Sequence, residues 1–216
     1  MIQTVTTDSG SRSKFDRIIE ELAENGLSVY DDFITPLQCS AMASEARRVH
    51  RTGAFRHARV GNGASMQLRP EIRNDRVYWL DSDKPGAAQI PYFLDLETLR
   101  QEINRNLYLG LFEFEGHFAL YPPGASYDIH YDRFIGTLER VVTCILYLNH
   151  AWQPDDGGEL VIYEGNDPST LPLPMQIQPL AGRLVCFMSE QFPHEVRSAR
   201  RDRLSLTGWF RVRSYR

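Results

Sequence analysis

A helical spacing of apolar residues runs through the first half of the chain. Three helices are expected, at 14–25, 36–49 and 91–109. Gly26 is placed to end the first helix, and Thr35 followed by Pro36 is typical of a helix start. Short strands are expected over 27–33 and around Val77 and Trp79, where apolar and polar residues alternate.

The period of the pattern changes to two after residue 110. Seven short strands separated by Gly, Pro and Asp are predicted, at 116–124, 127–132, 141–149, 158–164, 175–180, 182–189 and 203–212. Helices followed by many short strands of antiparallel type favour an α+β, mainly β fold. We expect a double-stranded β-helix (jelly roll) buttressed by N-terminal helices.

The length of the chain and the positions of its small, polar and turn-forming residues suggest a single domain with a short leader. The 216 residues fall within the range of one β-rich domain. Residues 1–12 are small and polar and are expected to form a flexible leader, followed by one domain over 13–216. Within it, 13–110 would form the helical buttress and 111–216 the jelly-roll core. The arginine-rich segment 53–80, interrupted by Gly53, Gly61 and Gly63, is the candidate for a mobile functional loop.

Composition narrows the setting in which the protein works. A net charge of -4 and a pI near 5.9 argue against binding nucleic acid through bulk phosphate neutralisation, although a local basic patch remains open. Cys39, Cys144 and Cys186 form no paired motif and read as buried reduced thiols, which fits a reducing cytoplasm. The chain has no apolar stretch of membrane-spanning length and no sustained apolar seam, so we expect no membrane partner and a monomer.

Metal-binding residue types cluster in the predicted sheet. His130 and Asp132 are two apart in an expected strand, so both side chains would project from one face. A His and an Asp two residues apart also occur by chance, so the competing interpretation is that both are polar residues on the protein surface. His194 follows a later strand and would complete two histidines and one carboxylate, the facial triad of non-haem iron(II) oxygenases.

The last predicted strand carries a polar face. Arg203, Ser205, Thr207 and Trp209 alternate with apolar residues, and none of these polar-face residues is acidic. An arginine inside a barrel needs an anionic partner, which a bound carboxylate ligand would supply. By the same parity Tyr147 could reach that carboxylate, and Tyr121 could enter the same space.

Five motifs in order carry a resemblance to a known family. They are YPPGASYDIHYD, VVTCILYLN, GGELVIYEG, FPHEV and RLSLTGWF, between Gly116 and Val212. This run resembles the 2-oxoglutarate and iron(II)-dependent prolyl hydroxylases, in particular the hypoxia-factor prolyl hydroxylases and their bacterial relatives. A weaker likeness in EIRNDRVYWLD extends it upstream to about Glu71.

The resemblance implies roles for individual residues. His130, Asp132 and His194 would be the catalytic iron ligands, and Arg203 would anchor 2-oxoglutarate with help from Tyr147 and Thr207. Tyr121 and Trp209 would line that pocket, and Arg140 would lie near the bound proline peptide. Trp79 would contact substrate or be a buried strand residue, and His117 would point inward or be a satisfied core histidine. Iron(II), 2-oxoglutarate and O2 would be required, with ascorbate as reductant.

The implied function is hydroxylation of a proline in an exposed loop of a cytosolic protein. Likeness to the bacterial members suggests a translation protein such as elongation factor Tu. Two alternatives stay open at this point: an oxygenase acting on a free amino acid, metabolite or nucleobase, and a non-catalytic 2-oxoglutarate or metal sensor. A cupin-type isomerase fits less well, because its metal sites use more histidines than this chain offers.

Overall fold

The computed structural model of the protein describes residues 12–61, 67–133, 139–163 and 174–213. The predicted leader, apart from Arg12, and Gly63 lie outside the described residues. None of the helices in the described ranges combines the length and the apolar character that crossing a bilayer requires.

Three helices form where the apolar periodicity predicts them. They are α1 (Lys14–Asn25), α2 (Pro36–Arg51) and α3 (Ile90–Leu107). The side chains of Ser13 and Thr35 each accept a hydrogen bond from the backbone of the first turn, so both α1 and α2 begin with a capping box. Gly26 ends α1 in the left-handed conformation at a φ of 69°, as expected of a glycine at this position.

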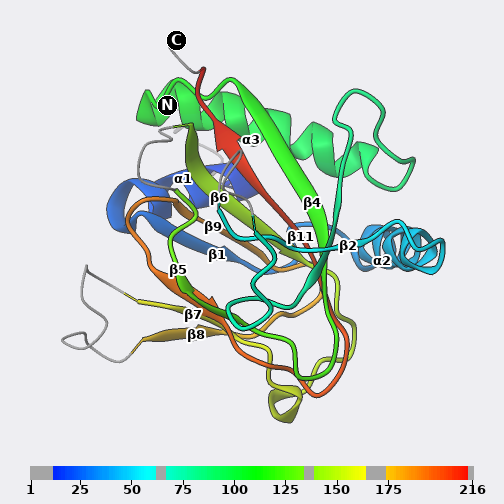
Figure 1. Cartoon of the computed structure of the whole chain (residues 1–216). Helices are drawn as coiled ribbons and strands as arrows, with labels where there is room; N and C mark the ends of the chain where they lie inside the picture. Colours follow the sequence, from blue (N-terminus) through cyan, green and yellow to red (C-terminus); the bar gives the residue numbers. More distant parts are fainter. Residues whose placement is uncertain (1–11, 62–66, 134–138, 164–173, 214–216) are drawn as a thin grey trace, which may run out of the picture.

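Within the described ranges, eleven strands form two antiparallel sheets, which confirms the mainly β jelly roll (Figure 1). The larger sheet has the order β1 (Leu27–Tyr30), β9 (Leu184–Met188), β6 (Arg140–Tyr147), β11 (Arg203–Arg211), β4 (Glu113–Tyr121), β3 (Arg76–Trp79) and β2 (Arg56–His57). The smaller sheet has the order β5 (Tyr127–His130), β10 (His194–Val196), β7 (Leu160–Ile162) and β8 (Met175–Ile177). The 3-10 turn η2 (Pro154–Asp156) precedes β7.

The central strand β11 separates two apolar clusters. Its residues Leu204, Leu206 and Phe210 belong to a core shared with the three helices. On the neighbouring strand β6, Ile145 and Tyr147 lie on the opposite face of the sheet from Leu206. They belong to a second cluster that also contains residues of the smaller sheet. One face of the larger sheet is therefore covered by helices, and the other lines the space between the sheets (Figure 1).

One short strand is missed by the sequence pattern and one local prediction is wrong. His194 follows the expected strand, β9, but it also begins β10 and pairs with His130 of β5 on one side and Ile162 of β7 on the other. Asp132 was expected within a strand, but β5 ends at His130 and Asp132 lies in the bend beyond it. The chain leaves the sheet there, so strand alternation does not direct the Asp132 side chain toward the histidines.

Candidate metal and co-substrate site

The smaller sheet and the bend after it bring three potential metal ligands together. One ligand atom each from His130, Asp132 and His194 lies within 4.8 Å of the others. The Nε2 atoms of the two histidines are both 3.6 Å from a carboxylate oxygen of Asp132. His130 and His194 are direct partners across the β5–β10 pair, which holds their rings on the same side of the sheet.

Backbone carbonyls fix the orientation of both imidazole rings. The Nδ1–H of His130 donates to the carbonyl of Asp128 at 2.8 Å, and that of His194 donates to the carbonyl of Phe192 at 3.0 Å. These bonds select the tautomer whose Nε2 lone pair faces Asp132. A carbonyl behind the ring is the arrangement that metal-bound histidines use in proteins.

The electrostatics of the cluster favour a divalent cation. Burial opposes ionisation of Asp132, but His194 and His130 outweigh it and hold the pKa of this carboxyl well below its usual range. Burial lowers the pKa of His194 to about 4. At neutral pH the cluster therefore offers one carboxylate and unprotonated imidazole nitrogen, a ligand set that suits iron(II).

The Asp132 carboxylate is held from behind by hydroxyl groups. Thr143 on β6 donates its hydroxyl to Oδ2 of Asp132 at 2.9 Å, and its oxygen lies 2.9 Å from that of Ser189. All three side chains are buried. This contact compensates for the position of Asp132 outside any strand, because it ties the bend to the larger sheet.

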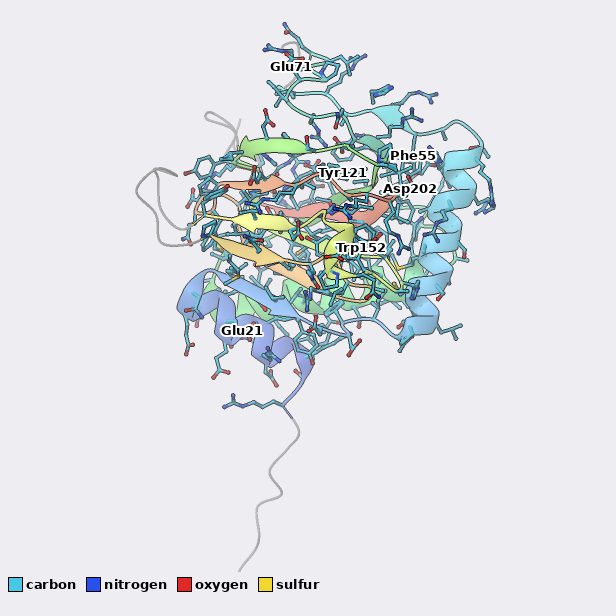
Figure 2. The ribbon with its side chains drawn as sticks, turned by 90° about the horizontal axis from the view of Figure 1, so that it is seen from below. Glu21, Phe55, Glu71, Tyr121, Trp152 and Asp202 are labelled. Atoms are coloured by element: carbon cyan, nitrogen blue, oxygen red, sulfur yellow. The ribbon has the colours of Figure 1, made fainter. Side chains whose placement is uncertain are left out.

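Arg203 lies in the same interior without a carboxylate partner. Its side chain is 1% exposed, its Nε donates to the carbonyl of Gly158 at 2.8 Å, and Nη2 donates weakly to the Tyr147 hydroxyl at 3.5 Å. The guanidinium carbon is 5.0 Å from the ring centres of both Tyr147 and Tyr121, and Tyr121 lies in the body of the molecule in Figure 2. No ion pair with Arg203 occurs among the residues described, which leaves a buried cation suited to an anionic ligand.

Two adjoining cavities connect this cation with the metal ligands and with the surface. The inner one is lined by all three candidate ligands and by the predicted co-substrate residues Arg203, Thr207, Tyr121 and Trp209. The indole Nε1 of Trp209 is buried and has no hydrogen-bond partner within the described ranges, so a donor remains for a ligand. Tyr147 packs beside Arg203, but it is not among the residues that line the cavity.

The outer cavity is a cleft of about 670 Å³ that shares Asp132, Trp209 and His117 with the inner one. Trp79 and Arg140, the two predicted substrate-binding residues, both line it. Trp79 is 51% exposed, so the alternative of a buried strand tryptophan is wrong. The cleft thus leads from the surface to the candidate metal ligands.

Comparison with known proteins identifies the family. Residues 116–211 match the family model of the 2OG-Fe(II) oxygenase superfamily. A prolyl-4-hydroxylase of Pseudomonas putida superposes with a TM-score of 0.81 and 40% identity, over 93% of this chain and 100% of that one. The chain belongs to the prolyl hydroxylases of this superfamily.

Animal members of the prolyl hydroxylase family are more distant. Human Egl nine homolog 1 is 30% identical over 201 residues, which cover 89% of this chain and 45% of the human protein. The chain spans about half the length of the human, rat and mouse forms of that relative. A Trichoplax adhaerens prolyl hydroxylase solved with a hypoxia inducible factor peptide superposes with a TM-score of 0.79 and 26% identity, over 91% of this chain.

Several residues around the prolyl hydroxylase site were not singled out from the sequence. Thr143 supports Asp132, Glu115 binds Arg140 at 2.7 Å, and Asp75 pairs with Arg73 at 2.7 Å beside the outer cleft. Strand parity placed Thr143 on the site face together with Tyr147, so its position was predictable although its partner was not. Arg140 and Glu115 lie in different strands, β6 and β4, which no spacing rule connects. Arg73 and Asp75 are only two residues apart in the segment before β3, so their spacing was visible in the sequence although their place beside the cleft was not.

His117 is also part of this site. Its buried ring lies 4.9 Å from the ring centre of Trp79 and 5.6 Å from that of Trp209. Of the two interpretations weighed for His117, the inward-pointing one describes its position. The two tryptophan ring centres are 6.2 Å apart, so the three rings form one cluster at the junction of the cavities.

Proposed function

We propose that the protein is a 2-oxoglutarate and iron(II)-dependent dioxygenase that hydroxylates a prolyl residue of a protein substrate. Family membership supports the reaction class. The observation that carries the proposal is the buried, unpaired Arg203 in the same cavity as the candidate ligands His130, Asp132 and His194. An oxygenase that does not use 2-oxoglutarate would have no carboxylate co-substrate for that cation to bind.

The proposed metal site uses groups that are ready to bind. His130 and His194 present Nε2 lone pairs because their Nδ1–H groups are engaged by carbonyls. Asp132 supplies the negative charge, and Thr143 holds it in place. Three protein ligands leave coordination positions open for a co-substrate and O2. Iron(II) bound there would activate O2, the oxidant, while 2-oxoglutarate would supply two of the electrons that O2 takes up and ascorbate would keep the metal reduced.

Arg203 would bind the distal carboxylate of 2-oxoglutarate. A guanidinium forms two parallel hydrogen bonds with a carboxylate, and the low polarity of the cavity strengthens them. Burial raises the pKa of the Tyr147 hydroxyl, so the phenol stays neutral and can donate to the same carboxylate. Thr207 and Trp209 line the cavity, each with a donor that can face the ligand, and Tyr121 closes one wall.

The outer cleft would hold the peptide. Trp79 offers a half-exposed aromatic surface at its wall, and aromatic rings pack well against the proline ring. The guanidinium carbon of Arg140 lies 3.5 Å from the ring centre of Trp209, which places a cation at the junction between cleft and cavity. A peptide carbonyl beside the target proline could accept from Arg140, and the filled cleft would exclude bulk water.

The test measures two products in parallel. Wild-type protein is incubated with iron(II), ascorbate, 2-oxoglutarate and a panel of proline-containing proteins, and His130→Ala serves as the inactive variant. We expect substrate-stimulated succinate and the mass increase of one oxygen atom on a proline, both absent with His130→Ala. Succinate without protein modification would indicate a small-molecule oxygenase. Absence of iron-dependent turnover would contradict the enzyme and favour a sensor.

Elongation factor Tu is the first translation protein to include in that panel. The choice follows the resemblance of the motifs to bacterial members of the family. Unmodified elongation factor Tu beside a modified second protein would refute this substrate and leave the reaction intact.

We also propose a monomer that works in the cytoplasm. Cys39, Cys144 and Cys186 are buried and free, and the sulfur atoms of Cys144 and Cys186 lie 3.5 Å apart without a bond. A reducing compartment keeps such thiols in this state. Sedimentation analysis tests the oligomeric state directly.

A further inference from the structure

The arginines at the mouth of the outer cleft differ from most others in the described chain. Arginines elsewhere are commonly held by a carboxylate, as Arg183 is by Asp31 and Arg100 is by Glu97. Arg56 and Arg59 are exposed and have no carboxylate partner among the residues described. Arg56 donates to the backbone carbonyls of Gly53 and Phe55, which leaves its charge uncompensated.

These two residues stand on the wall of the cleft that leads to the candidate metal site. Arg56 belongs to β2, at the edge of the larger sheet, and Arg59 follows two residues after the strand. In Figure 2 the described parts of this segment, between the labelled Phe55 and Glu71, lie at the outer edge of the molecule. Both side chains line the cleft of about 670 Å³.

The cleft is basic although the whole chain is acidic. Its charged lining within the described ranges consists of four arginines and one carboxylate, Asp132, which is a candidate metal ligand. Arg73 and Arg140 are neutralised by Asp75 and Glu115, respectively. The sequences 62–66 and 134–138 contain no charged residue, while the net charge of the chain is -4. The excess positive charge of the cleft therefore comes from Arg56 and Arg59.

We propose that Arg56 and Arg59 select protein substrates that carry an acidic side chain, Asp or Glu, close in sequence to the target proline. This inference rests on the proposed prolyl hydroxylase function. A substrate carboxylate would bind a guanidinium in the two-pronged geometry, while the proline lies deeper, toward Trp79. Arg203 and this pair thus use the same chemistry for two different carboxylates.

A peptide fits this cleft better than a free dicarboxylate does. The cleft of about 670 Å³ is larger than one dicarboxylate, and Arg56 and Arg59 line it without lining the inner cavity that contains the candidate metal ligands. A nucleic acid is disfavoured by the overall charge, because it would have to approach an acidic protein through phosphate contacts with few cations.

The test compares matched peptides of one sequence that contains a single proline. In three versions the neighbouring positions carry Glu, Gln or Lys. We expect wild type to hydroxylate the Glu peptide about tenfold more efficiently, by kcat/KM, than the Gln peptide, with the Lys peptide poorest. The difference should lie in KM and should shrink as salt is raised from low ionic strength, because the arginines are exposed.

Substitution of the two arginines should remove this preference. Arg56→Gln and Arg59→Gln should each reduce the Glu-peptide advantage about two- to threefold, and the double variant should abolish it while the Gln peptide reacts as before. Arg56→Glu combined with Arg59→Glu, which reverses the excess charge of the cleft, should reverse the order of the Glu and Lys peptides. The control is Arg200→Gln, an exposed arginine outside both cavities, which should behave as wild type.

Anaerobic binding of the fluorescein-labelled peptides, followed by anisotropy, gives a second reading that needs no turnover. Equal affinity for the Glu and Gln peptides, or a preference that survives in the double variant, would overturn the inference. The inference would also be overturned if a single-stranded oligonucleotide displaced the labelled Glu peptide at a lower concentration than the unlabelled Glu peptide does. Arginine-dependent binding of the Glu peptide without hydroxylation of any proline would instead contradict the proposed function alone.

Discussion

Arg203 is the side chain on which the proposed chemistry depends most. Its guanidinium lies near two phenol rings, and its shorter hydrogen bond is the one to the carbonyl of Gly158, at 2.8 Å. A Cβ at position 158 would lie 3.1 Å from Cδ of Arg203, so a glycine leaves room for the arginine side chain. Gly158 therefore holds Arg203 through its carbonyl and through its lack of a side chain.

Exchange of Arg203 for Lys tests the anchor. An ammonium cannot make the two-pronged contact, and we expect the KM for 2-oxoglutarate to rise at least about tenfold. Succinate formation at varied 2-oxoglutarate measures this change. Arg200→Lys is the matched control, and an unchanged KM in Arg203→Lys would refute the anchor.

Thr143 tests whether support of the carboxylate matters to metal binding. Valine has the same shape and removes only the hydroxyl that donates to Asp132. We expect Thr143→Val to weaken iron(II) binding about tenfold, as loss of a hydrogen bond to a metal-bound carboxylate does. Anaerobic titration with iron(II) provides the dissociation constant. Thr98→Val, on the exposed surface of α3, should leave it unchanged.

Residue alternation predicted which side chains face the interior but not which atoms meet. Parity placed Arg203, Thr207 and Tyr147 on the interior face, and the structure brings Arg203 and Tyr147 into contact. The contact of Asp132 with Thr143 depends on how the chain bends after β5, and the contact of Arg140 with Glu115 depends on the order of strands in the sheet. A short window of sequence predicts neither the bend nor the strand order.

At the scale of elements, β11 joins the helical core to the site. It pairs with β4 on one side and β6 on the other, and its residues alternate between the core shared with the helices and the inner cavity. Gly208 faces Gly116 directly across the β4–β11 pair. A Cβ at position 208 would overlap the Phe114 ring and the Glu115 carbonyl.

Gly208→Ala should therefore destabilise the protein by about 3 kcal/mol, because neither strand can move without disturbing both faces. Urea unfolding followed by circular dichroism measures the free energy. Gly53→Ala separates overlap from backbone strain, since nothing lies within 4 Å of its Cβ position while its φ is +73°. The control should cost about 1 kcal/mol, and a loss of the same size in both variants would contradict close packing at Gly208.

Long periodic elements were predictable from the sequence, and short ones less so. The expected helix 14–25 has the bounds of α1, because its apolar stripe, Ser13 and Gly26 agree. β10 is only three residues long and follows Phe192 and Pro193, so alternation had too few positions to reveal it. β10 is defined as a strand by its pairing with β5 and β7.

At the scale of the whole molecule, buried histidine links folding to pH. Burial lowers the pKa of His117 to about 4, against about 6.5 in an unfolded chain. As pH falls from 6.5 to 4, the unfolded state takes up the proton first, so stability is lost across that window. Below pH 4 both states are protonated and the loss stops.

We expect this histidine alone to account for about 3 kcal/mol of lost stability between pH 7 and pH 4. His117→Phe keeps a ring in contact with Trp79 and Trp209 but cannot titrate. Urea unfolding of both proteins at several pH values isolates the difference, and parallel pH profiles would show that His117 carries no such linkage.

The position of β2 at the margin of the larger sheet, far in strand order from the central β11, has a consequence for how this scaffold can diversify. Substitutions near Arg56 and Arg59 disturb a two-residue strand paired on one side only, whereas those in β11 disturb two neighbouring strands and either the helical core or the inner cavity. Natural drift or laboratory evolution can therefore change the substrate preference through the segment of Arg56 and Arg59 while the residues of the metal and co-substrate site stay the same.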